Sequence, residues 1–363
     1  MAALIEEGSV KILLKSLHEY RGPGRRGTGF YNPTLEIDRD LTVAFCAHAA
    51  REGAYTFLDG LAATGIRGIR IAKEAGENLE VDINERKPES YELVKKNIAL
   101  NEVKARALNH DLRMLLQQKK YDYIDIDPYG SPVPFLPYLF RALKKRTYLT
   151  VTATDTATLC GVWRRTCIRK YQAIPLKGET SKEAGLRILT GYIARQAAGE
   201  GYGFTPLLAY TRSHFFRVYG MMKRGVKAAE ESLSHVGWIY WDDGWRTSPF
   251  QHFLGEPRAG PLWIGPLHDE AVLYDIQQEV ETRKLKKKEE LMKLLQYFHE
   301  EAHLPPLYYE SSSIAKECRT SQPKMATILA ELKDRGYEAG TCHFSPDAFK
   351  TDAPYEIITS LFG

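Results

Sequence analysis

The chain has 363 residues, of which 44% are hydrophobic and 26% are charged, and its formal net charge is +4. This length predicts two domains or one large domain with an appendage, and the composition excludes a disordered or fibrous protein. With so small a net charge, any attraction to a polyanion must come from local basic patches. The five cysteines form no CxxC pair, which argues against a zinc knuckle and a disulfide framework and fits a reducing compartment.

The N-terminal segment does not predict export or membrane insertion. MAALIEEGSVKILL carries acids where a signal peptide needs bases, and no segment approaches the roughly 20 apolar residues of a membrane span. We therefore expect a cytoplasmic protein that does not associate with a membrane, and nothing in the sequence calls for an obligate protein partner.

The first half of the chain alternates between strand and helix patterns. A short strand at Ser9–Leu14 precedes the loop RGPGRRGTGF, which is rich in glycine and arginine. From residue 55 on we expect strands at 55–59, 79–83, 105–111, 121–127 and 148–155, with helices at 63–76, 85–101, 112–120 and 133–145. Such alternation with short connections predicts a parallel sheet flanked by helices, which is a Rossmann-like α/β domain.

The second half begins with elements that should complete this sheet. After a helix around Glu183–Ala198, PLLAY and FFRVYGMMK predict an antiparallel hairpin that closes it. The sequence pattern changes near Gly265-Pro266, and one long polar helix is expected after it, over Asp269–Ala302. Two short helices at 314–318 and 323–335 and a strand at 337–344 follow. We therefore expect one domain over residues 1–265 and a C-terminal α+β, winged-helix-like domain over residues 266–363.

Carboxylates stand at the ends of four successive predicted strands, namely Asp59, Asp82, Asp111 and Asp127. Such strand ends line one crevice in an open α/β sheet. Each acid alone has a structural explanation as a helix cap, but the four together favour a ligand site. The turn DGLAATGIRG does not form the fingerprint G-x-G-x-x-G, and no phosphate-binding loop is present. Since clustered carboxylates repel anions, the expected ligand is nucleoside-like, with Asp82 placed for ribose hydroxyls.

The strand at 121–127 ends on Asp127-Pro128-Tyr129, which suits the handling of an exocyclic amine on a planar heterocycle. The carboxylate can accept the amine N–H, and the fixed φ of proline points its carbonyl at the same place. The aromatic ring can stack on the base, which is worth roughly 1–3 kcal/mol. Holding the amine in line with an electrophile and removing its proton would supply the catalysis. The alternative is that Asp127-Pro128 only ends the strand and Tyr129 packs in the core.

DPYGSP resembles the Asp/Asn-Pro-Pro-aromatic motif of amino-group methyltransferases, although its aromatic residue comes one place earlier. Taken with FYNP, LAATGIRG, TATDTATLCG, GPLWIGPL and HFSPDAFKTDAPYE, it resembles the tRNA (guanine-26, N2)-dimethyltransferase family in its archaeal form, over essentially the whole chain. The resemblance implies a class I methyltransferase domain that uses S-adenosyl-L-methionine, and a C-terminal domain peculiar to the family. It also implies methylation, usually twice, of the exocyclic N2 of a guanine between the D and anticodon stems of tRNA.

The resemblance also assigns residues to the cofactor. Asp59 is expected beneath the methionine part, Asp82 at the ribose hydroxyls, and Asp111 at the adenine. The full set of cofactor residues that it implies is Arg39, Asp59, Gly65, Arg67, Asp82, Asp111 and Leu112.

On the substrate side, the resemblance implies that Asp127 is the catalytic carboxylate and that Pro128 assists it. Tyr129 stands where the family usually has phenylalanine, and we expect it to clamp the base together with Phe30. Basic clusters recur along the chain, and the arginines that follow TATDTATLCG, Arg164 and Arg165, are expected to contact tRNA phosphates.

Two further expectations concern metals and alternative functions. Some family members carry a four-cysteine zinc site, but WDDGWRTSPFQHFLGEPRAG occupies that region here without cysteine, so we expect no metal. The alternatives are an amino-methyltransferase of the same fold that acts on another nucleic acid or on protein glutamine, and an RNA-binding protein with a vestigial cofactor pocket. The full-length resemblance argues against the first alternative, and the intact acids argue against the second. The number of methyl groups transferred stays open.

Overall fold

The computed structural model describes residues 3–14 and 30–363, so the predicted glycine- and arginine-rich loop lies, except for Phe30, outside the described residues. The chain forms two compact units. One comprises Met1–Thr154, Tyr219–Arg224 and Ala271–Lys293, and the other comprises Asp155–Val218, Gly225–Glu270 and Leu294–Gly363. The sequence predicts a single domain boundary at residue 265. A change in composition along the chain can reveal a boundary between two continuous domains, but it cannot reveal segments that return to an earlier domain. Here the chain returns twice to the first unit.

A seven-stranded sheet with the order β5-β4-β3-β6-β7-β9-β8 dominates the fold. Its first five strands pair in parallel, as the sequence predicts, and the two strands of the predicted hairpin follow at one end. The order reverses direction between β3 and β6, which is where open α/β sheets bind ligands. The strands are β3 (Thr56–Asp59), β4 (Glu80–Asn84), β5 (Ala105–Leu108), β6 (Tyr121–Ile126), β7 (Leu143–Ala153), β8 (Tyr202–Arg212) and β9 (Phe215–Arg224).

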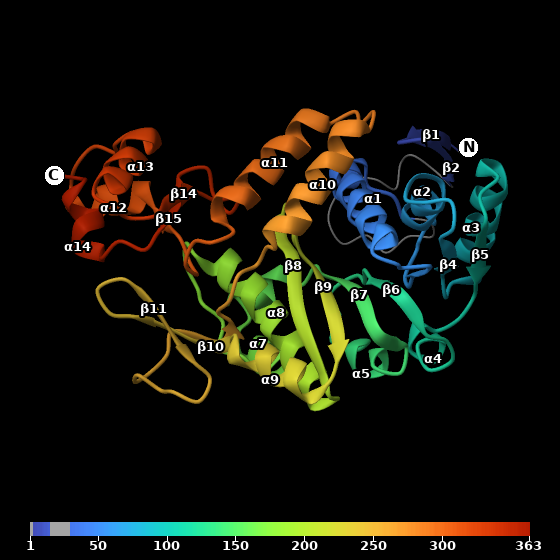
Figure 1. The fold of residues 1–363 in the computed structure, drawn as a ribbon, viewed down its shortest axis with the longest axis horizontal. Coiled ribbons are helices and arrows are strands. Elements are labelled where there is room, and N and C mark those ends of the chain that lie inside the picture. Colours follow the sequence, from blue (N-terminus) through green and yellow to red (C-terminus); the bar gives the residue numbers. More distant parts are fainter. Residues whose placement is uncertain (1–2, 15–29) are drawn as a thin grey trace. The chain divides into compact units, whose positions relative to one another are not determined.

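Helices in the first unit support the parallel strands (Figure 1). α2 packs against β4, and α3 packs against β5. The sequence pattern does not predict α1, because its polar Asp38, Asp40 and Thr42 are as buried as its apolar residues and leave no amphipathic pattern. The bounds are η2 (Pro33–Leu35), α1 (Glu36–Arg51), α2 (Ile66–Glu74), α3 (Pro88–Asn101), α4 (Leu112–Leu115) and α5 (Leu136–Leu139).

Three predicted helices are wrong in extent. The expected helix at 112–120 ends at Leu115. The expected helix at 133–145 shrinks to the single turn α5, because Pro132, Pro134 and Pro137 remove backbone donors and β7 begins at Leu143. The expected long helix at 269–302 divides into α10 (Glu270–Thr282) and α11 (Lys288–Glu301). Like charges crowd the intervening segment RKLKK, which disfavours a continuous helix.

The second unit contains a three-stranded sheet of order β11-β10-β12 and a C-terminal module with the sheet order β13-β15-β14. The module packs Ile314, Leu332 and Phe349 into its own core. Its two helices α12 and α13 are followed by a strand, as the sequence predicts, but a strand precedes them and a helix ends the module, so the winged-helix-like assignment stays a prediction. The bounds are α6 (Thr156–Leu159), α7 (Arg164–Tyr171), α8 (Ser181–Gly199), α9 (Val226–Ser234), β10 (Val236–Trp241), β11 (Trp245–Pro249), β12 (Ala259–Trp263), β13 (Tyr309–Glu310), α12 (Ser311–Cys318), α13 (Met325–Asp334), β14 (Ala339–Thr341), β15 (Ala348–Thr351) and α14 (Tyr355–Ser360). Within the described residues, no helix has both the length and the apolar character needed to cross a membrane.

An N-terminal hairpin of β1 (Ala3–Glu7) and β2 (Val10–Leu14) is attached to α3 by side-chain amides. The Asn97 amide oxygen accepts the Leu13 N–H at 2.8 Å, and its nitrogen donates to the Leu13 and Thr64 carbonyls. Asn101 exchanges the same pair of hydrogen bonds with Lys11. Each of these amides pairs with a backbone N–H and a backbone carbonyl of β2, as a neighbouring strand would. They therefore fix the position of the hairpin against α3.

We expect Asn97→Ala to lower the free energy of unfolding by roughly 2–4 kcal/mol, because it leaves buried backbone groups of Leu13 and Thr64 without partners. Urea unfolding followed by circular dichroism measures this change. The control is Lys95→Ala, which removes an exposed ion pair with Glu92 on the same helix and should cost less than about 1 kcal/mol. Equal losses in the two variants would contradict the role of the amide.

Candidate active site

The carboxylates of Asp59 and Asp127 meet at one edge of the sheet, because Asp59 ends β3 and Asp127 follows β6, its parallel neighbour. Arg67, in the first turn of α2, links the acids at this edge. Its Nη1 lies 2.6 Å from Oδ2 of Asp127 and 3.1 Å from Oδ2 of the buried Asp125. The structure therefore brings together three predicted site residues and adds Asp125.

The glycine turn after β3 allows this close approach. A Cβ at Gly60 would lie 2.9 Å from the Asp125 carbonyl oxygen and 3.0 Å from the Leu112 side chain. Gly65 has φ of +79° at the start of α2, which a side chain rarely adopts. The Gly68 N–H donates to Oδ2 of Asp59 at 3.0 Å. The turn therefore places the start of α2 directly against the acids.

Burial raises the pKa of Asp59 to about 7. The Arg67 charge and the Gly68 N–H pull this pKa down, whereas the negative charges of Asp125 and Asp127 push it up. Asp59 is consequently a carboxyl group that changes charge near neutral pH, and a cationic ligand group beside it would favour its ionised form.

The segment Asp127–Gly130 is fixed in place by Thr154, the residue after β7. The Gly130 N–H donates to the Thr154 hydroxyl at 2.6 Å, and the Thr154 N–H donates to the Gly130 carbonyl at 2.9 Å. Tyr129 is 47% exposed, and its ring meets that of Phe30 edge to face at a centroid distance of 5.4 Å. The two rings expected to clamp a base are thus neighbours and close to the Asp127 carboxylate.

Asp82 occupies a different position from the other acids. Its carboxylate, 4% exposed, binds Arg106 through two hydrogen bonds and also accepts from Lys119 and Tyr121. Although burial opposes ionisation, these partners lower the pKa of Asp82 overall. Asp82 lies two residues before the end of β4, so its carboxylate is engaged within the sheet rather than presented at its edge.

Glu85, which the sequence pattern did not single out, stands at this edge of the sheet. It follows the last residue of β4, and its carboxylate accepts the Ala63 N–H of the glycine turn at 3.0 Å and the Lys87 N–H at 2.9 Å. Its charge also raises the pKa of Tyr129, after the larger effects of burial and Asp127. The feature that could have identified Glu85 is its position: it directly follows the strand β4, whereas Asp82 lies inside that strand.

Asp111 caps α4, and Leu112 begins that helix. The Asp111 carboxylate accepts hydrogen bonds from the backbone N–H, Nε and Nη2 of Arg113, which hold its pKa down at about 2. Leu112 is buried against Gly60. Leu112 therefore lies against the glycine turn, and a contact of Asp111 and Leu112 with an adenine stays a prediction.

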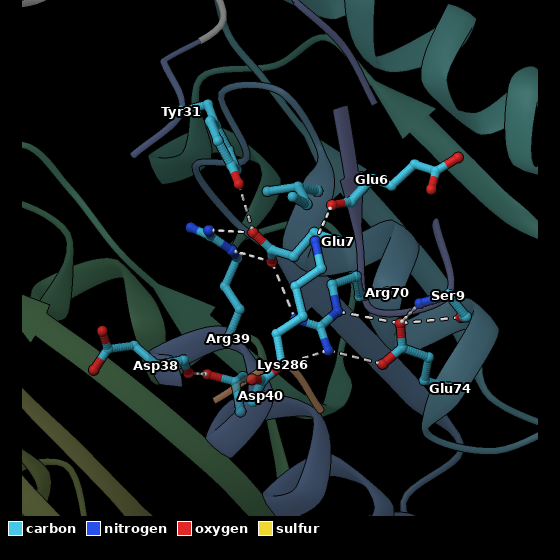
Figure 2. A network of polar contacts seen from close by, with 12 residues as sticks. Glu6, Glu7, Ser9, Tyr31, Asp38, Arg39, Asp40, Arg70, Glu74 and Lys286 are labelled. Carbon is cyan, nitrogen blue, oxygen red and sulfur yellow. Dashed lines mark hydrogen bonds and ion pairs between the residues drawn. The ribbon is translucent and has the colours of Figure 1, made fainter. Parts of the chain in front are cut away.

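Arg39 lies on α1 and is buried in a network of ion pairs (Figure 2). Its guanidinium binds both carboxylate oxygens of Glu7, at 2.6 Å and 2.5 Å. Nη2 also donates to the Asn32 carbonyl at 3.1 Å, and the group lies 4.9 Å from the centre of the Tyr31 ring. Arg39 is therefore held firmly before any ligand arrives.

Arg164 and Arg165 belong to the second unit, where they begin α7 on an exposed surface. No ion pair links either of them to the residues that the structure describes. The preceding Trp163 is 62% exposed, which is unusual for so large an apolar ring. The surface formed by residues 163–165 thus combines an aromatic ring with two positive charges.

The second unit also buries His268, Glu301 and His343, whose ligand-type atoms lie within 4.8 Å of one another. The Thr211 N–H donates to Nε2 of His343 at 3.1 Å, so Nδ1 carries the ring proton and donates it to Glu301. Both nitrogens of His343 are therefore used, whereas Nε2 of the buried His268 lies 3.4 Å from Oε1 of Glu301 without a hydrogen bond. The expectation from the sequence stays that the chain binds no metal.

The fold and the site define a class I methyltransferase, and comparisons with known proteins agree. The structure resembles that of Trm1 from Pyrococcus horikoshii in complex with S-adenosyl-L-methionine, with a TM-score of 0.90, 36% identity and 99% coverage of both chains. Proteins named tRNA (guanine(26)-N(2))-dimethyltransferase are 40% identical in Pyrococcus horikoshii, over 98% of this chain and 96% of the relative, and 34% identical in Thermoplasma acidophilum, over 99% and 96%.

The sequence model of the N2,N2-dimethylguanosine tRNA methyltransferase family matches residues 23–362 of the chain. The chain belongs to this family, is an enzyme, and uses S-adenosyl-L-methionine.

The resemblance to the family implies that Asp59 lies beneath the methionine part of the cofactor, which carries an ammonium group, and the pKa of Asp59 is about 7. On that assignment we expect the affinity for S-adenosyl-L-methionine to rise about tenfold between pH 5.5 and 7. Protons must leave Asp59 before the ionised carboxylate can face a cation, so affinity falls as pH falls through 7. Isothermal titration calorimetry over this range provides the measurement. Asp59→Asn should bind weakly at every pH, and an unchanged pH dependence in this variant would assign the titration to another group.

Proposed function

We propose that the protein transfers one or two methyl groups from S-adenosyl-L-methionine to the exocyclic N2 of guanine 26 in tRNA. The observation that carries this proposal is the arrangement of Asp127, which is ion-paired with Arg67 and whose charge acts on Tyr129, with the Phe30 ring packed against the Tyr129 ring. A carboxylate together with two aromatic rings suits a planar base that must give up an amine proton.

The residues around the glycine turn fit the cofactor. The cofactor supplies a methyl group made electrophilic by its sulfonium. Asp59 would face the methionine ammonium, and Asp111 with Leu112 would meet the adenine. For the ribose hydroxyls we propose Glu85 rather than Asp82, because the Asp82 carboxylate already binds Arg106, Lys119 and Tyr121.

Asp127 would act on the amine. Its carboxylate accepts an N–H of guanine N2 and turns the nitrogen lone pair toward the methyl group, and the Pro128 carbonyl directs the same amine. As the N–C bond forms and the C–S bond breaks, the amine loses a proton, which the carboxylate receives and passes to water. Arg67 holds the carboxylate in this orientation at 2.6 Å.

Phe30 and Tyr129 would bind the base between them. In the structure the two rings touch edge to face, so they must separate for a base to enter. Guanine must first leave its stack in the folded tRNA, at a cost of a few kcal/mol, and stacking on two aromatic rings offsets part of this cost.

The exposed surface of Trp163, Arg164 and Arg165 is proposed as a tRNA contact. Two arginines without acidic partners among residues 3–14 and 30–363 suit phosphates, and a tryptophan that is 62% exposed suits an unpaired base. Such contacts would position the RNA while the active site selects one guanine. A tRNA substrate also fits a cytoplasmic enzyme with no membrane association and no obligate protein partner.

The runner-up function is amino-group methylation of another nucleic acid or of protein glutamine by the same fold. The experiment that separates the two is mass spectrometry of nucleosides from unmodified tRNA incubated with the enzyme and S-adenosyl-L-methionine, beside a transcript in which guanine 26 is adenine. Methylated guanosine that disappears with this change supports the proposal, and its mass gives the number of methyl groups. No methylated guanosine on any tRNA would reject it.

In the same assay, Asp127→Ala should lower the turnover rate by at least about a thousandfold while cofactor binding persists, because the proton acceptor is lost. The control is Asp122→Asn on the same strand, whose side chain binds Lys144 and Thr56 away from the site and should leave turnover nearly unchanged. Near-normal turnover in Asp127→Ala would remove this residue from the mechanism.

Replacing both Arg164 and Arg165 with alanine should weaken tRNA binding and reduce the salt dependence of log Kd by roughly 1–2, because up to two phosphate contacts disappear. Filter binding at several salt concentrations tests this, and cofactor affinity should not change. The control is Arg246→Ala, an exposed arginine of the same unit that pairs with Asp242. An unchanged salt dependence in the double variant would place the RNA elsewhere.

A further inference from the structure

Glu7, in the N-terminal hairpin, lies at the centre of the buried network drawn in Figure 2. Its side chain is 1% exposed, and its carboxylate accepts four hydrogen bonds. Two come from Arg39, one comes from the Tyr31 hydroxyl at 2.9 Å, and one comes from Nη1 of Arg70 at 3.0 Å. A carboxylate has about four lone-pair sites, so its accepting capacity is used fully.

The network makes Glu7 a fixed point rather than a mobile surface acid. Arg70 is fully buried and also pairs with Asp40 at 2.6 Å and Glu74 at 2.9 Å. Although burial opposes ionisation, the hydrogen bond and charge of Arg39 keep the pKa of Glu7 below its ordinary value. The adjacent Gly8 has φ of +56°, and a Cβ there would lie 2.5 Å from the Glu74 carboxylate. The hairpin turn is therefore built against this network.

The geometry of Arg39 shows which of its atoms remain for a ligand. Nε and Nη2 are occupied by Glu7 and by the Asn32 carbonyl. Nη1 makes no hydrogen bond to the part of the chain that the structure describes. Because a guanidinium is planar and rigid, fixing two of its nitrogens also fixes the direction of the third.

We propose that Glu7 is a positioning residue for cofactor binding, which aims Nη1 of Arg39 at the methionine carboxylate of S-adenosyl-L-methionine. This inference rests on the proposed role of Arg39 as a cofactor residue. The methionine carboxylate is the single anionic group of the cofactor, so it is the natural partner of a preoriented guanidinium. The same carboxylate of Glu7 holds Tyr31, and Tyr31 precedes the NP of FYNP and follows the base-clamping Phe30.

The contacts thus join three parts of the first unit that are far apart in sequence: the hairpin, the FYNP segment and α1. Glu7 binds the FYNP segment through Tyr31 and α1 through Arg39. The residue would therefore fix the cofactor arginine and the segment that bears Phe30 relative to each other.

The test compares two ligands that differ in the amino acid part. S-adenosyl-L-homocysteine carries the carboxylate, whereas 5′-methylthioadenosine lacks it. For Glu7→Gln we expect an increase of at least about tenfold in the Kd of the first ligand, since a charge-assisted contact loses its orientation. The Kd of the second ligand should change by less than about twofold. A role in general stability would weaken both ligands alike.

The matched control is Glu74→Gln, which disturbs the same network at Arg70 and Ser9 but does not touch Arg39. It should leave both Kd values near those of the wild type, even if the melting temperature falls as much as in Glu7→Gln. Equal effects of the two substitutions on ligand binding would overturn the proposal.

A double-mutant cycle with Arg39→Lys shows whether Glu7 acts through Arg39. Glu7→Gln should add little to the loss already caused by Arg39→Lys, and additive losses would overturn the proposal. If Arg39→Lys alone leaves S-adenosyl-L-homocysteine binding unchanged, the cofactor role of Arg39 fails and the proposal fails with it. If Arg39→Lys weakens binding but Glu7→Gln does not, the positioning role alone is wrong.

Should Glu7→Gln fail to fold, Tyr31→Phe provides a milder variant, because it removes one hydrogen bond from Glu7 and keeps the ring beside Arg39. It should weaken S-adenosyl-L-homocysteine roughly two- to threefold and leave 5′-methylthioadenosine unchanged. An equal effect on the two ligands would again overturn the proposal.

Discussion

The ion pairs of Arg67 with Asp125 and Asp127 are the interaction on which the active site depends. Asp59, Asp125 and Asp127 lie at one edge of the sheet, and two of these carboxyl groups are buried. Desolvated like charges repel strongly, so such a group is stable only with a cation close by. Arg67 provides that cation from the first turn of α2. The glycine turn that lets α2 begin there is therefore an electrostatic requirement as much as a steric one.

The same principle explains why the first unit buries so many charged residues next to its active edge. Arg39 and Arg70 are nearly inaccessible, and each has acidic partners on a different element. Ion pairs of this kind add little net stability, but removing one partner leaves a buried charge without compensation. Their geometric effect is larger: bidentate contacts between guanidinium and carboxylate define orientation as well as distance. The network thus suits a site whose ligand must be held in line for transfer.

The sequence predicts the parallel sheet, and it predicts that Asp59, Arg67 and Asp127 lie together, because both follow from local patterns: alternating strands and helices, a glycine turn, and acids at strand ends. It could not predict α1, whose buried charges are explained only by partners such as Glu7 and Arg70. It assigned the ribose hydroxyls to Asp82 and did not single out Glu85, since distance from the glycine turn does not reveal whether a side chain lies within a strand or beyond its end. The helix expected at 133–145 is reduced to the single turn α5, because three prolines outweigh the helical preference of the apolar residues there.

Tyr129 stands where the resemblance implies a phenylalanine, and its surroundings indicate what the extra hydroxyl does. Burial raises the pKa of Tyr129, and the charges of Asp127 and Glu85 raise it further. The phenol therefore stays neutral, so its stacking ring adds no negative charge to an edge already crowded with carboxylates. Its hydroxyl adds a polar group close to where the proposed methylated amine would lie. After the first transfer, the space around this group would decide whether a monomethylated guanine can turn its second N–H toward Asp127.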